Sequence, residues 1–243
     1  MEHSVMITGA SGALAQAVMR QARAQGWRII AVSRQEMPAD WDENEVWLQE
    51  DVSSSRGVET VFAELGNRGI VPDCLAHLAG SFLLAGLGQT SESQYRQCLA
   101  ANLDSAFFTL RGFVAARRKA GGGGAAVFVS SVVAHIGVAF HEAVAAAKGG
   151  VEALVLAAAA THARDQIRVN AVRSGLMDSK AASHILRNDR ARELARQQYP
   201  LGELIAPEEV SRSVLFLLEA SQITGQILAV DGGFGAIRPL VTS

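Results

Sequence analysis

Residues 5–15 read VMITGASGALA, and this stretch decides the fold because an apolar run passes through a glycine turn into helix-forming residues. Gly9 lets the chain turn tightly, Gly12 lets the backbone approach a pyrophosphate, and Ala15 is small enough for a helix to pack on a sheet. The free amides at such a helix N-terminus favour phosphate groups. We therefore predict a loop that binds dinucleotide phosphates, rather than a plain turn between strand and helix. The expected contacts come from Thr8, Gly9, Ser11, Gly12, Ala13 and Leu14.

Short apolar runs alternate with segments of helical period along almost the whole chain. Strands that are apolar throughout are typical of a parallel sheet covered on both faces, and their alternation with helices predicts βαβ units. We therefore predict one α/β domain over residues 1–243, with a doubly wound parallel sheet flanked by helices in three layers. The expected strands are 5–7, 28–32, 46–48, 74–78, 126–129, 168–172 and 227–230, and the expected helices lie near 13–26, 55–66, 92–119, 142–163 and 207–220.

The composition indicates a globular protein and argues against several kinds of partner. Of the 243 residues, 49% are hydrophobic and 19% are charged, and 22 Lys and Arg nearly balance 24 Asp and Glu. Because a nucleic-acid-binding domain usually shows a basic stripe, we expect no nucleic-acid partner, and the short run 117–119 is predicted to be a solvated helix end. Cys74 and Cys98 have no nearby His ligands, so neither a disulfide framework nor a metal site is predicted.

No targeting or membrane segment is predicted from the sequence pattern. The first ten residues, MEHSVMITGA, lack a basic region followed by an apolar stretch, so we predict no signal peptide. The apolar run over residues 151–160 is too short to span a bilayer. We expect a cytoplasmic protein with no membrane partner.

A second stretch carries the chemistry. Residues 130–148 read SSVVAHIGVAFHEAVAAAK. This segment resembles the catalytic segment of the short-chain dehydrogenase/reductase family, in which a Ser, a Tyr thirteen residues later and a Lys four residues after that do the chemistry. Ser131 and Lys148 are in register with that pattern, but the position of the Tyr is Val144, which has no proton to give. The resemblance covers nearly the whole chain and implies a single-domain Rossmann fold.

The resemblance also implies roles for residues at this end of the molecule. Ser131 would hold the substrate oxygen, and Lys148 would donate to the nicotinamide ribose and lower the pKa of a neighbouring acid. Asn102 would bend its helix and position a water linked to Lys148. The missing Tyr removes the usual proton source. His141, seven residues before Lys148 as the Tyr is in the related enoyl-acyl-carrier reductases, or His135 can stand in; the remaining alternatives are water-mediated proton transfer and no chemistry.

The end of the second predicted strand bears on the choice of cofactor. Members of the family that prefer NAD have an acidic residue there, whereas this chain has Ser33 followed by Arg34. A carboxylate repels a 2′-phosphate and a guanidinium pairs with it, so NADP(H) is favoured and NAD(H) stays open. His77 stands where the family has an Asn, and we predict a histidine with satisfied hydrogen bonds, either buried or at an edge, rather than a ligand. The resemblance places further cofactor contacts at Asp51, Val52, Ala79, Gly80, Lys148, Gly175 and Ser179.

The predicted function is an NAD(P)(H)-dependent oxidoreductase that acts on a small carbonyl, alcohol or activated alkene. The alternative is a catalytically impaired nucleotide-binding pseudoenzyme or regulatory subunit, and a non-redox enzyme in the same pocket is a third reading. Segment 174–200 follows a strand end and is expected to be a mobile, partly helical substrate lid, whose arginines mark a helix face or an anionic substrate. Because two long helices pair across a two-fold axis in the family, we expect a homodimer or homotetramer.

Overall fold

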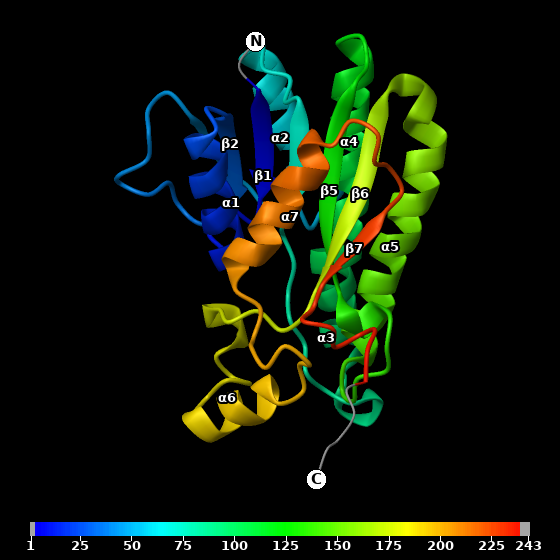
Figure 1. Cartoon of the computed structure of the whole chain (residues 1–243). Helices are drawn as coiled ribbons and strands as arrows, with labels where there is room; N and C mark the ends of the chain where they lie inside the picture. Colours follow the sequence, from blue (N-terminus) through cyan, green and yellow to red (C-terminus); the bar gives the residue numbers. More distant parts are fainter. Residues whose placement is uncertain (1–2, 239–243) are drawn as a thin grey trace.

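The computed structural model describes residues 3–238 and confirms the doubly wound parallel sheet. Seven parallel strands run in the order β3-β2-β1-β4-β5-β6-β7, so the winding reverses between β1 and β4. All strands point their carboxyl ends to the same edge, the lower one in Figure 1. The predicted domain of 1–243 includes residues 1–2 and 239–243, which lie outside the described part. The strands are β1 Ser4–Thr8, β2 Arg28–Ser33, β3 Val46–Gln49, β4 Cys74–His77, β5 Gly124–Ser131, β6 Ile167–Ser174 and β7 Ile227–Val230.

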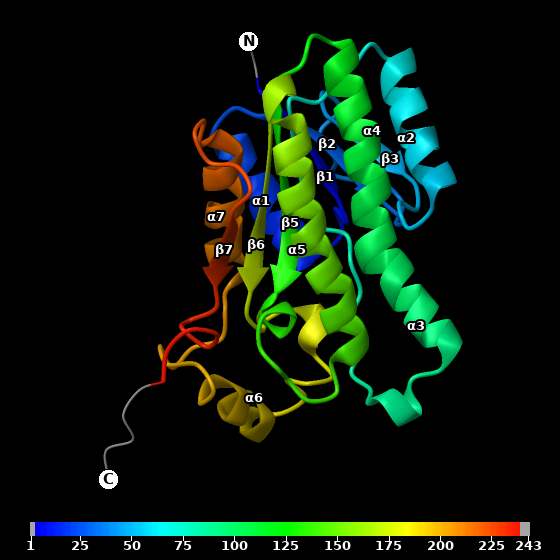
Figure 2. The ribbon, with the colours of Figure 1, turned by 90° about the vertical axis from the view of Figure 1, so that its right-hand side faces the viewer.

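Helices cover both faces of the sheet and complete the three layers (Figure 2). Helices α1 and α7 share one hydrophobic core with the sheet, while α2, α4 and α5 share the other. Helices α3 and α6 lie beyond the carboxyl ends of the strands. The helices are α1 Ala13–Ala24, α2 Ser55–Asn67, α3 Glu92–Leu99, α4 Ser105–Lys119, α5 Glu142–His162, α6 Asp189–Arg196 and α7 Pro207–Glu219.

The inner strand β1 shows why the strands are apolar at successive positions. Side chains on a strand alternate between the two faces of the sheet. Val5 and Ile7 belong to the core under α1 and α7, and Met6 belongs to the core under α2, α4 and α5. Both faces of the sheet are therefore dry, and a polar residue within β1 would lie in one of the two cores.

The helix predicted over 92–119 is interrupted where the sequence places Asn102. A π-helical segment, η2 (Ala100–Asp104), separates α3 from α4. The Asn102 amide nitrogen donates to the carbonyl oxygen of Cys98 at 2.9 Å, and the Ser105 hydroxyl donates to the carbonyl oxygen of Ala101 at 2.8 Å. Such side chains compete for backbone carbonyls and disturb regular helix. The expected irregularity at Asn102 is thus present as a π segment.

Helix α5 and the short turn that follows it form the one described segment, Glu142–Asp165, that is long and apolar enough to cross a membrane by length and composition. Its residues Val151, Val155 and Ala158 lie in the core under the sheet. A helix that covers a sheet has the same length and composition, so this property is only weak support for a membrane span.

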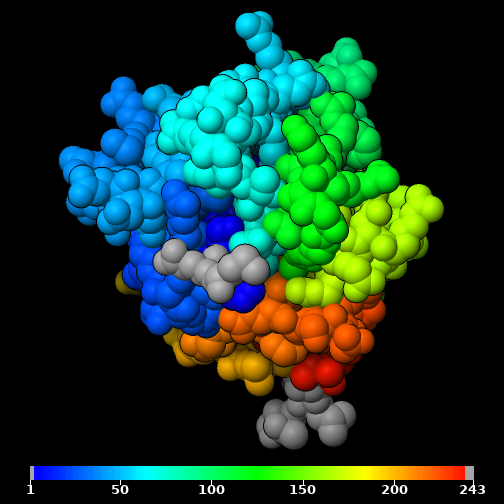
Figure 3. Space-filling model, turned by 90° about the horizontal axis from the view of Figure 1, so that it is seen from above, coloured from blue at the N-terminus to red at the C-terminus, as the bar shows by residue number. Residues whose placement is uncertain are grey.

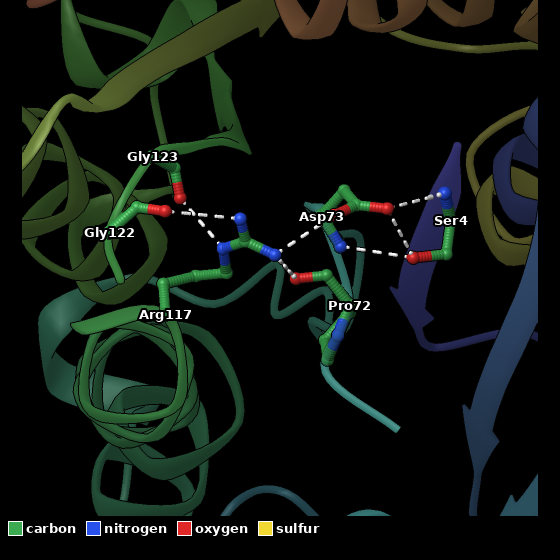
Figure 4. Close-up of polar contacts among 6 residues, drawn as sticks. All are labelled: Ser4, Pro72, Asp73, Arg117, Gly122 and Gly123. Carbon is green, nitrogen blue, oxygen red and sulfur yellow. Dashed lines mark hydrogen bonds and ion pairs between the residues drawn. The ribbon is translucent and has the colours of Figure 1, made fainter. Parts of the chain in front are cut away.

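The amino ends of the strands are held together by Arg117, near the end of α4 (Figure 4). Its guanidinium donates to the carbonyl oxygens of Gly123 at 2.7 Å and Gly122 at 3.1 Å, and to the Asp73 carboxylate at 2.9 Å. The same carboxylate accepts from the Ser4 hydroxyl at 2.8 Å. The prediction of a solvated helix end is therefore wrong for Arg117, because one side chain joins α4, the glycine run and the starts of β4 and β1. Figure 3 looks down on this end, where a hollow is lined by Asp73 and Arg117 among others.

Replacement of Arg117 should destabilise the fold because three groups lose a charged hydrogen-bond donor. We expect Arg117→Ala to lower the free energy of unfolding by about 2 kcal/mol, as measured by urea denaturation followed by circular dichroism. Arg118→Ala is the matched control, since Arg118 is 57% exposed and lies 3.5 Å from Asp165; its cost should stay below about 1 kcal/mol. Equal losses in the two variants would contradict this role of Arg117.

Candidate active site

A cavity of about 760 Å³ opens at the carboxyl ends of the strands. It spans the point where strand order reverses between β1 and β4, which is where open α/β sheets bind their ligands. Nearly all of the predicted site residues line this single cavity, although they come from eight separate parts of the chain. These residues are Gly9, Ser11, Gly12, Ala13, Leu14, Ser33, Arg34, Asp51, Val52, Ala79, Gly80, Asn102, Ser131, His141, Lys148, Gly175 and Ser179.

The turn between β1 and α1 forms one wall of the cavity and needs its glycines. Gly9 has a φ of +68°, and a Cβ atom built on it would lie 2.9 Å from the backbone of Ala79. Gly12 donates its amide to the carbonyl oxygen of Gly9 at 2.9 Å and precedes Ala13, the first residue of α1, without any side-chain cap. The first amides of α1 are therefore left for a ligand, which suits an anionic group.

Thr8 lies beneath this turn and does not line the cavity. Its hydroxyl oxygen accepts from the amides of Leu78 at 3.2 Å and Ala79 at 3.3 Å, so its proton is donated to Nδ1 of His77 at 3.0 Å. Thr8 therefore fixes the end of β4 against the end of β1, and its contact with the cofactor stays a prediction.

His77 continues this chain of hydrogen bonds into the π segment. With Nδ1 accepting from Thr8, Nε2 carries the proton and donates to the Ser105 hydroxyl at 3.1 Å, which in turn donates to Ala101. Burial, together with the nearby charge of Lys148, lowers the pKa of His77 to about 3, so this ring is neutral. The expectation of a buried and satisfied histidine is confirmed.

The end of the cavity beside β2 and β3 is polar. The Ser33 hydroxyl donates to the Ser11 hydroxyl at 3.2 Å, and Arg34 follows it at the cavity wall. Asp51 accepts from the Ser53 amide at 2.9 Å, while Glu50 accepts from the Asp51 amide at 2.9 Å. Glu50 also lines the cavity, which the sequence analysis missed because an acid at the end of a short strand has no pattern that marks it.

The opposite end of the cavity brings together the residues of the catalytic pattern. Ser131 ends β5, and the Lys148 ammonium donates to the carbonyl oxygen of Val129 at 2.8 Å. Burial lowers the pKa of Lys148 to about 8. Asn102 accepts from the Ser81 amide at 3.2 Å, and its carbonyl oxygen lies 2.8 Å from where a Cβ atom on Gly80 would stand. Gly80 is thus required for the close approach of Asn102 to this wall.

Val144 stands one helical turn before Lys148, on the buried face of α5. It packs in a small hydrophobic cluster with Cys98, Val132 and Val133, and it lines the cavity. An apolar surface therefore faces the cavity where the catalytic pattern has a phenol. Across residues 3–238 there is no group of three His, Cys, Asp or Glu side chains that could hold a metal ion.

His141 immediately precedes α5 and lines the cavity near Val144, with its ring held in place. Nδ1 lies 2.7 Å from the carbonyl oxygen of Ala139, which can only accept, so Nδ1 is the donor and Nε2 is left for another partner. Phe140 has a φ of +65°, a conformation rare for a bulky residue, and its carbonyl oxygen accepts from the Ala85 amide at 3.0 Å. His135, by contrast, is exposed and lies outside the cavity lining.

Comparison with known proteins supports what this geometry indicates. The family described as Enoyl-(Acyl carrier protein) reductase matches residues 9–235. The chain is 31% identical over 250 residues to cis-4-hydroxycyclohexanecarboxylate dehydrogenase of Sinomonas cyclohexanicum, and the aligned region covers 97% of this chain and 98% of that relative. It is also 31% identical over 239 residues to carbonyl reductase family member 4 of Danio rerio, at 96% and 98% coverage.

The chain belongs to the short-chain dehydrogenase/reductase family. Solved structures agree on the fold. A 4-hydroxyisoleucine dehydrogenase complexed with NADH has a TM-score of 0.92 at 20% identity, covering 98% of this chain and 100% of that one. ElxO with NADP bound has a TM-score of 0.88 at 22% identity, with 96% and 99% coverage. At these identities the likeness speaks for the fold alone.

Segment 174–200 of this short-chain dehydrogenase/reductase is partly helical, as predicted, and carries a small core of its own around Ala182, Leu186 and Ala195. Two of its arginines form ion pairs: Arg192 pairs with Asp178 in the same segment, and Arg196 pairs with Glu203 just after it at 2.6 Å. Those two side chains therefore stabilise the fold of this segment.

A tyrosine of this segment supports the cavity wall, which the sequence analysis missed. The Tyr199 hydroxyl accepts from the Leu176 amide at 2.6 Å, and its ring lies 5.2 Å from that of Phe234. A Cβ atom on Gly175 would lie 2.8 Å from the Tyr199 ring. Gly175 is therefore required for the packing of Tyr199, a contact that joins positions far apart in the sequence.

Lys148 should make the stability of the unliganded protein depend on pH. Its pKa is about 8 in the folded state and 10.5 as the ordinary value, so below pH 8 the fold bears the full cost of burying the charge. We expect Lys148→Met to raise the melting temperature at pH 7. The difference from wild type should shrink as pH rises from 8 towards 10.5, because the folded form then releases its proton before the unfolded form does. Calorimetry across pH 7–9.5 measures this, and a difference that stays constant would contradict the burial of the charge.

Proposed function

We propose that the chain is an NAD(P)(H)-dependent oxidoreductase that interconverts a small carbonyl compound, or an activated alkene, and its reduced form. One observation carries this proposal: a single cavity has a cradle for phosphate at one end and Ser131, Lys148 and Asn102 at the other. The names of the relatives, a hydroxy-acid dehydrogenase and a carbonyl reductase, support the same class of reaction.

The residues of the cavity fit a nicotinamide dinucleotide. The amides after Gly12 suit its pyrophosphate, and Asp51 and Val52 line the wall assigned to its adenine. Lys148, Gly175 and Ser179 line the wall assigned to its nicotinamide half, and NADH and NADP are the ligands named for the two structural neighbours. When bound, this cofactor supplies or accepts a hydride at the substrate carbon.

The chain itself must supply the proton that reduction of a carbonyl requires. Ser131 donates a hydrogen bond to the substrate oxygen. His141, as an imidazolium with a proton on each ring nitrogen, gives its Nε2 proton to that oxygen and keeps the Nδ1 proton hydrogen-bonded to the Ala139 carbonyl. The backbone hydrogen bond on one ring nitrogen fixes the orientation of the other, which is how histidine is aimed in proton transfer. Lys148 contributes its charge at the floor of the cavity, one turn from Val144.

A second candidate function is a nucleotide-binding pseudoenzyme. The observation that favours it is Val144, whose packing with Cys98 and Val133 leaves an apolar surface where the family pattern has its proton donor. A pseudoenzyme would still bind the cofactor but would not convert a substrate, so the two candidate functions differ in the rate of carbonyl reduction.

Substitution of His141 separates these readings. We expect His141→Ala to lower the rate of carbonyl reduction by ~10²–10⁴-fold, the usual worth of a general acid, when oxidation of the reduced cofactor is followed at 340 nm over a panel of ketones. His135→Ala is the matched control and should leave the rate unchanged, because His135 lies outside the cavity lining. Val144→Tyr should restore activity in the His141→Ala background.

A turnover rate that does not change in His141→Ala would contradict the proposed proton donor. A protein that binds the cofactor but has no turnover would favour the pseudoenzyme.

NADP(H) is our proposed cofactor, with NAD(H) as the weaker ligand. The end of β2 carries Ser33 in place of an acid, and Arg34 lines the same wall. A guanidinium pairs with a 2′-phosphate in two parallel hydrogen bonds.

Fluorescence titration tests this preference. We expect wild type to bind NADPH more tightly than NADH, and Arg34→Ala to weaken NADPH binding while NADH binding changes little. Ser33→Asp should turn the preference towards NADH, because its carboxylate would repel the 2′-phosphate. Equal binding of the two cofactors by wild type would rule out the proposed role of Arg34.

We further propose that the protein is a cytoplasmic homodimer or homotetramer. Phe107 on α4 is 50% exposed and Leu156 on α5 is 54% exposed. Large apolar side chains on two neighbouring helices suit burial against a second copy of the chain.

A further inference from the structure

A three-way polar contact lies directly behind the proposed catalytic residues. Arg173 of β6 donates to both oxygens of the Glu152 carboxylate, at 2.9 Å and 2.7 Å. The Ser130 hydroxyl of β5 donates to the same carboxylate at 2.7 Å. The side chains of Glu152 and Arg173 are each only 14% exposed. A bidentate, largely buried ion pair of this kind holds its two side chains in one geometry more firmly than a surface ion pair does.

The charges of this contact are held in their ionised forms. Burial on its own would raise the pKa of Glu152, but the hydrogen bonds from Arg173 and Ser130 outweigh it and the pKa is lowered. The hydrogen bond to Glu152, with the nearby charge of Asp231, raises the pKa of Arg173. The contact therefore persists as an ion pair with a hydroxyl donor.

Each member of the contact is next to a residue of the proposed site. Ser130 precedes Ser131 on β5, and successive side chains on a strand point to opposite faces, so fixing Ser130 on α5 fixes the register of Ser131. Glu152 lies one helical turn after Lys148 on α5. Arg173 precedes Ser174 and Gly175, which line the cavity at the end of β6. One carboxylate thus ties together the three elements that carry Ser131, Lys148 and Gly175.

The charge of Asp231, which follows β7, is the smallest of the causes that raise the pKa of Arg173. The Asp231 carboxylate accepts from the amides of Gly233 and Gly235, both at 3.0 Å, and so shapes the turn that holds Phe234 at the cavity wall.

We propose that Glu152 is a positioning residue, which holds Ser131 and Lys148 at the spacing that the reaction needs through its contacts with Ser130 and Arg173. This inference rests on the proposed function, but it adds a residue that touches neither substrate nor cofactor. A purely structural ion pair would affect stability alone, whereas a positioning residue affects the rate, since small displacements of reacting groups are costly.

The chain offers a matched control for this distinction. The ion pair of Asp73 with Arg117 is also Arg–carboxylate and partly buried, but it lies at the amino ends of the strands, away from the cavity (Figure 4). Asp73→Asn and Glu152→Gln each remove one carboxylate charge from such a pair. Ser130→Ala is a third variant, which keeps the Glu152–Arg173 ion pair and removes the hydroxyl that links it to β5.

Steady-state kinetics and hydrogen exchange together test the proposal. We expect Glu152→Gln and Ser130→Ala to lower kcat by up to about 100-fold, while KM for the reduced cofactor changes little. Amide exchange in residues 128–133 should become faster in both variants. Asp73→Asn should lower the melting temperature but leave kcat and the exchange of residues 128–133 as in wild type.

The outcomes separate this inference from the proposed function. A wild type without turnover on any carbonyl defeats the proposed function, and the exchange of residues 128–133 then decides the role of Glu152 by itself. Unchanged kcat and unchanged exchange in Ser130→Ala would overturn the inference, even where Glu152→Gln fails to fold. A loss of kcat in Asp73→Asn equal to that in Glu152→Gln would also overturn it, because the effect would then be one of stability.

Discussion

The close approach of Gly9 to Ala79 constrains the rest of the site. A Cβ atom on Gly9 would lie 2.9 Å from the Ala79 backbone, so the turn after β1 and the loop after β4 can meet only through a glycine. This contact lies where the strand order reverses, between β1 and β4. It leaves the first amides of α1 facing the cavity on one side and brings the loop with Gly80 towards Asn102 on the other. One contact therefore positions both the amides that we propose for phosphate and the loop that approaches Asn102.

Buried polar contacts then fix the two ends of the cavity relative to each other. Thr8 and His77 join the end of β1 to Ser105, at the start of α4 just after the π segment, and burial keeps the histidine neutral. Unpaired polar groups in this interior would be costly, so the chain of donors and acceptors specifies one arrangement. On the same face of the sheet, the Glu152 carboxylate is a charged counterpart that joins β5, β6 and α5. Ser105 and Ser130, one member of each set of contacts, also line the cavity.

Local patterns in the sequence were sufficient for the fold and for most of the cavity. The apolar runs predicted the strands, because helices cover both faces of the sheet. The turn of Gly9 and Gly12 predicted the end of the cavity that we propose for phosphate. Local patterns could not predict the burial of Thr8, because its hydrogen-bond partner His77 lies 69 residues away in the sequence. They also predicted that Arg117 is solvated, because its acceptor Asp73 is 44 residues away. Contacts of this kind depend on topology and leave no periodic signal.

In the proposed mechanism, His141 supplies the proton in a cavity where Val144 takes the place of a tyrosine. A crystal structure of the chain with NADP⁺ and an unreactive ketone analogue tests this assignment. We expect the analogue oxygen to lie within hydrogen-bond reach, about 3 Å, of both the Ser131 hydroxyl and Nε2 of His141. An analogue oxygen that contacts Ser131 while His141 points to solvent, or an analogue bound outside this cavity, would contradict it.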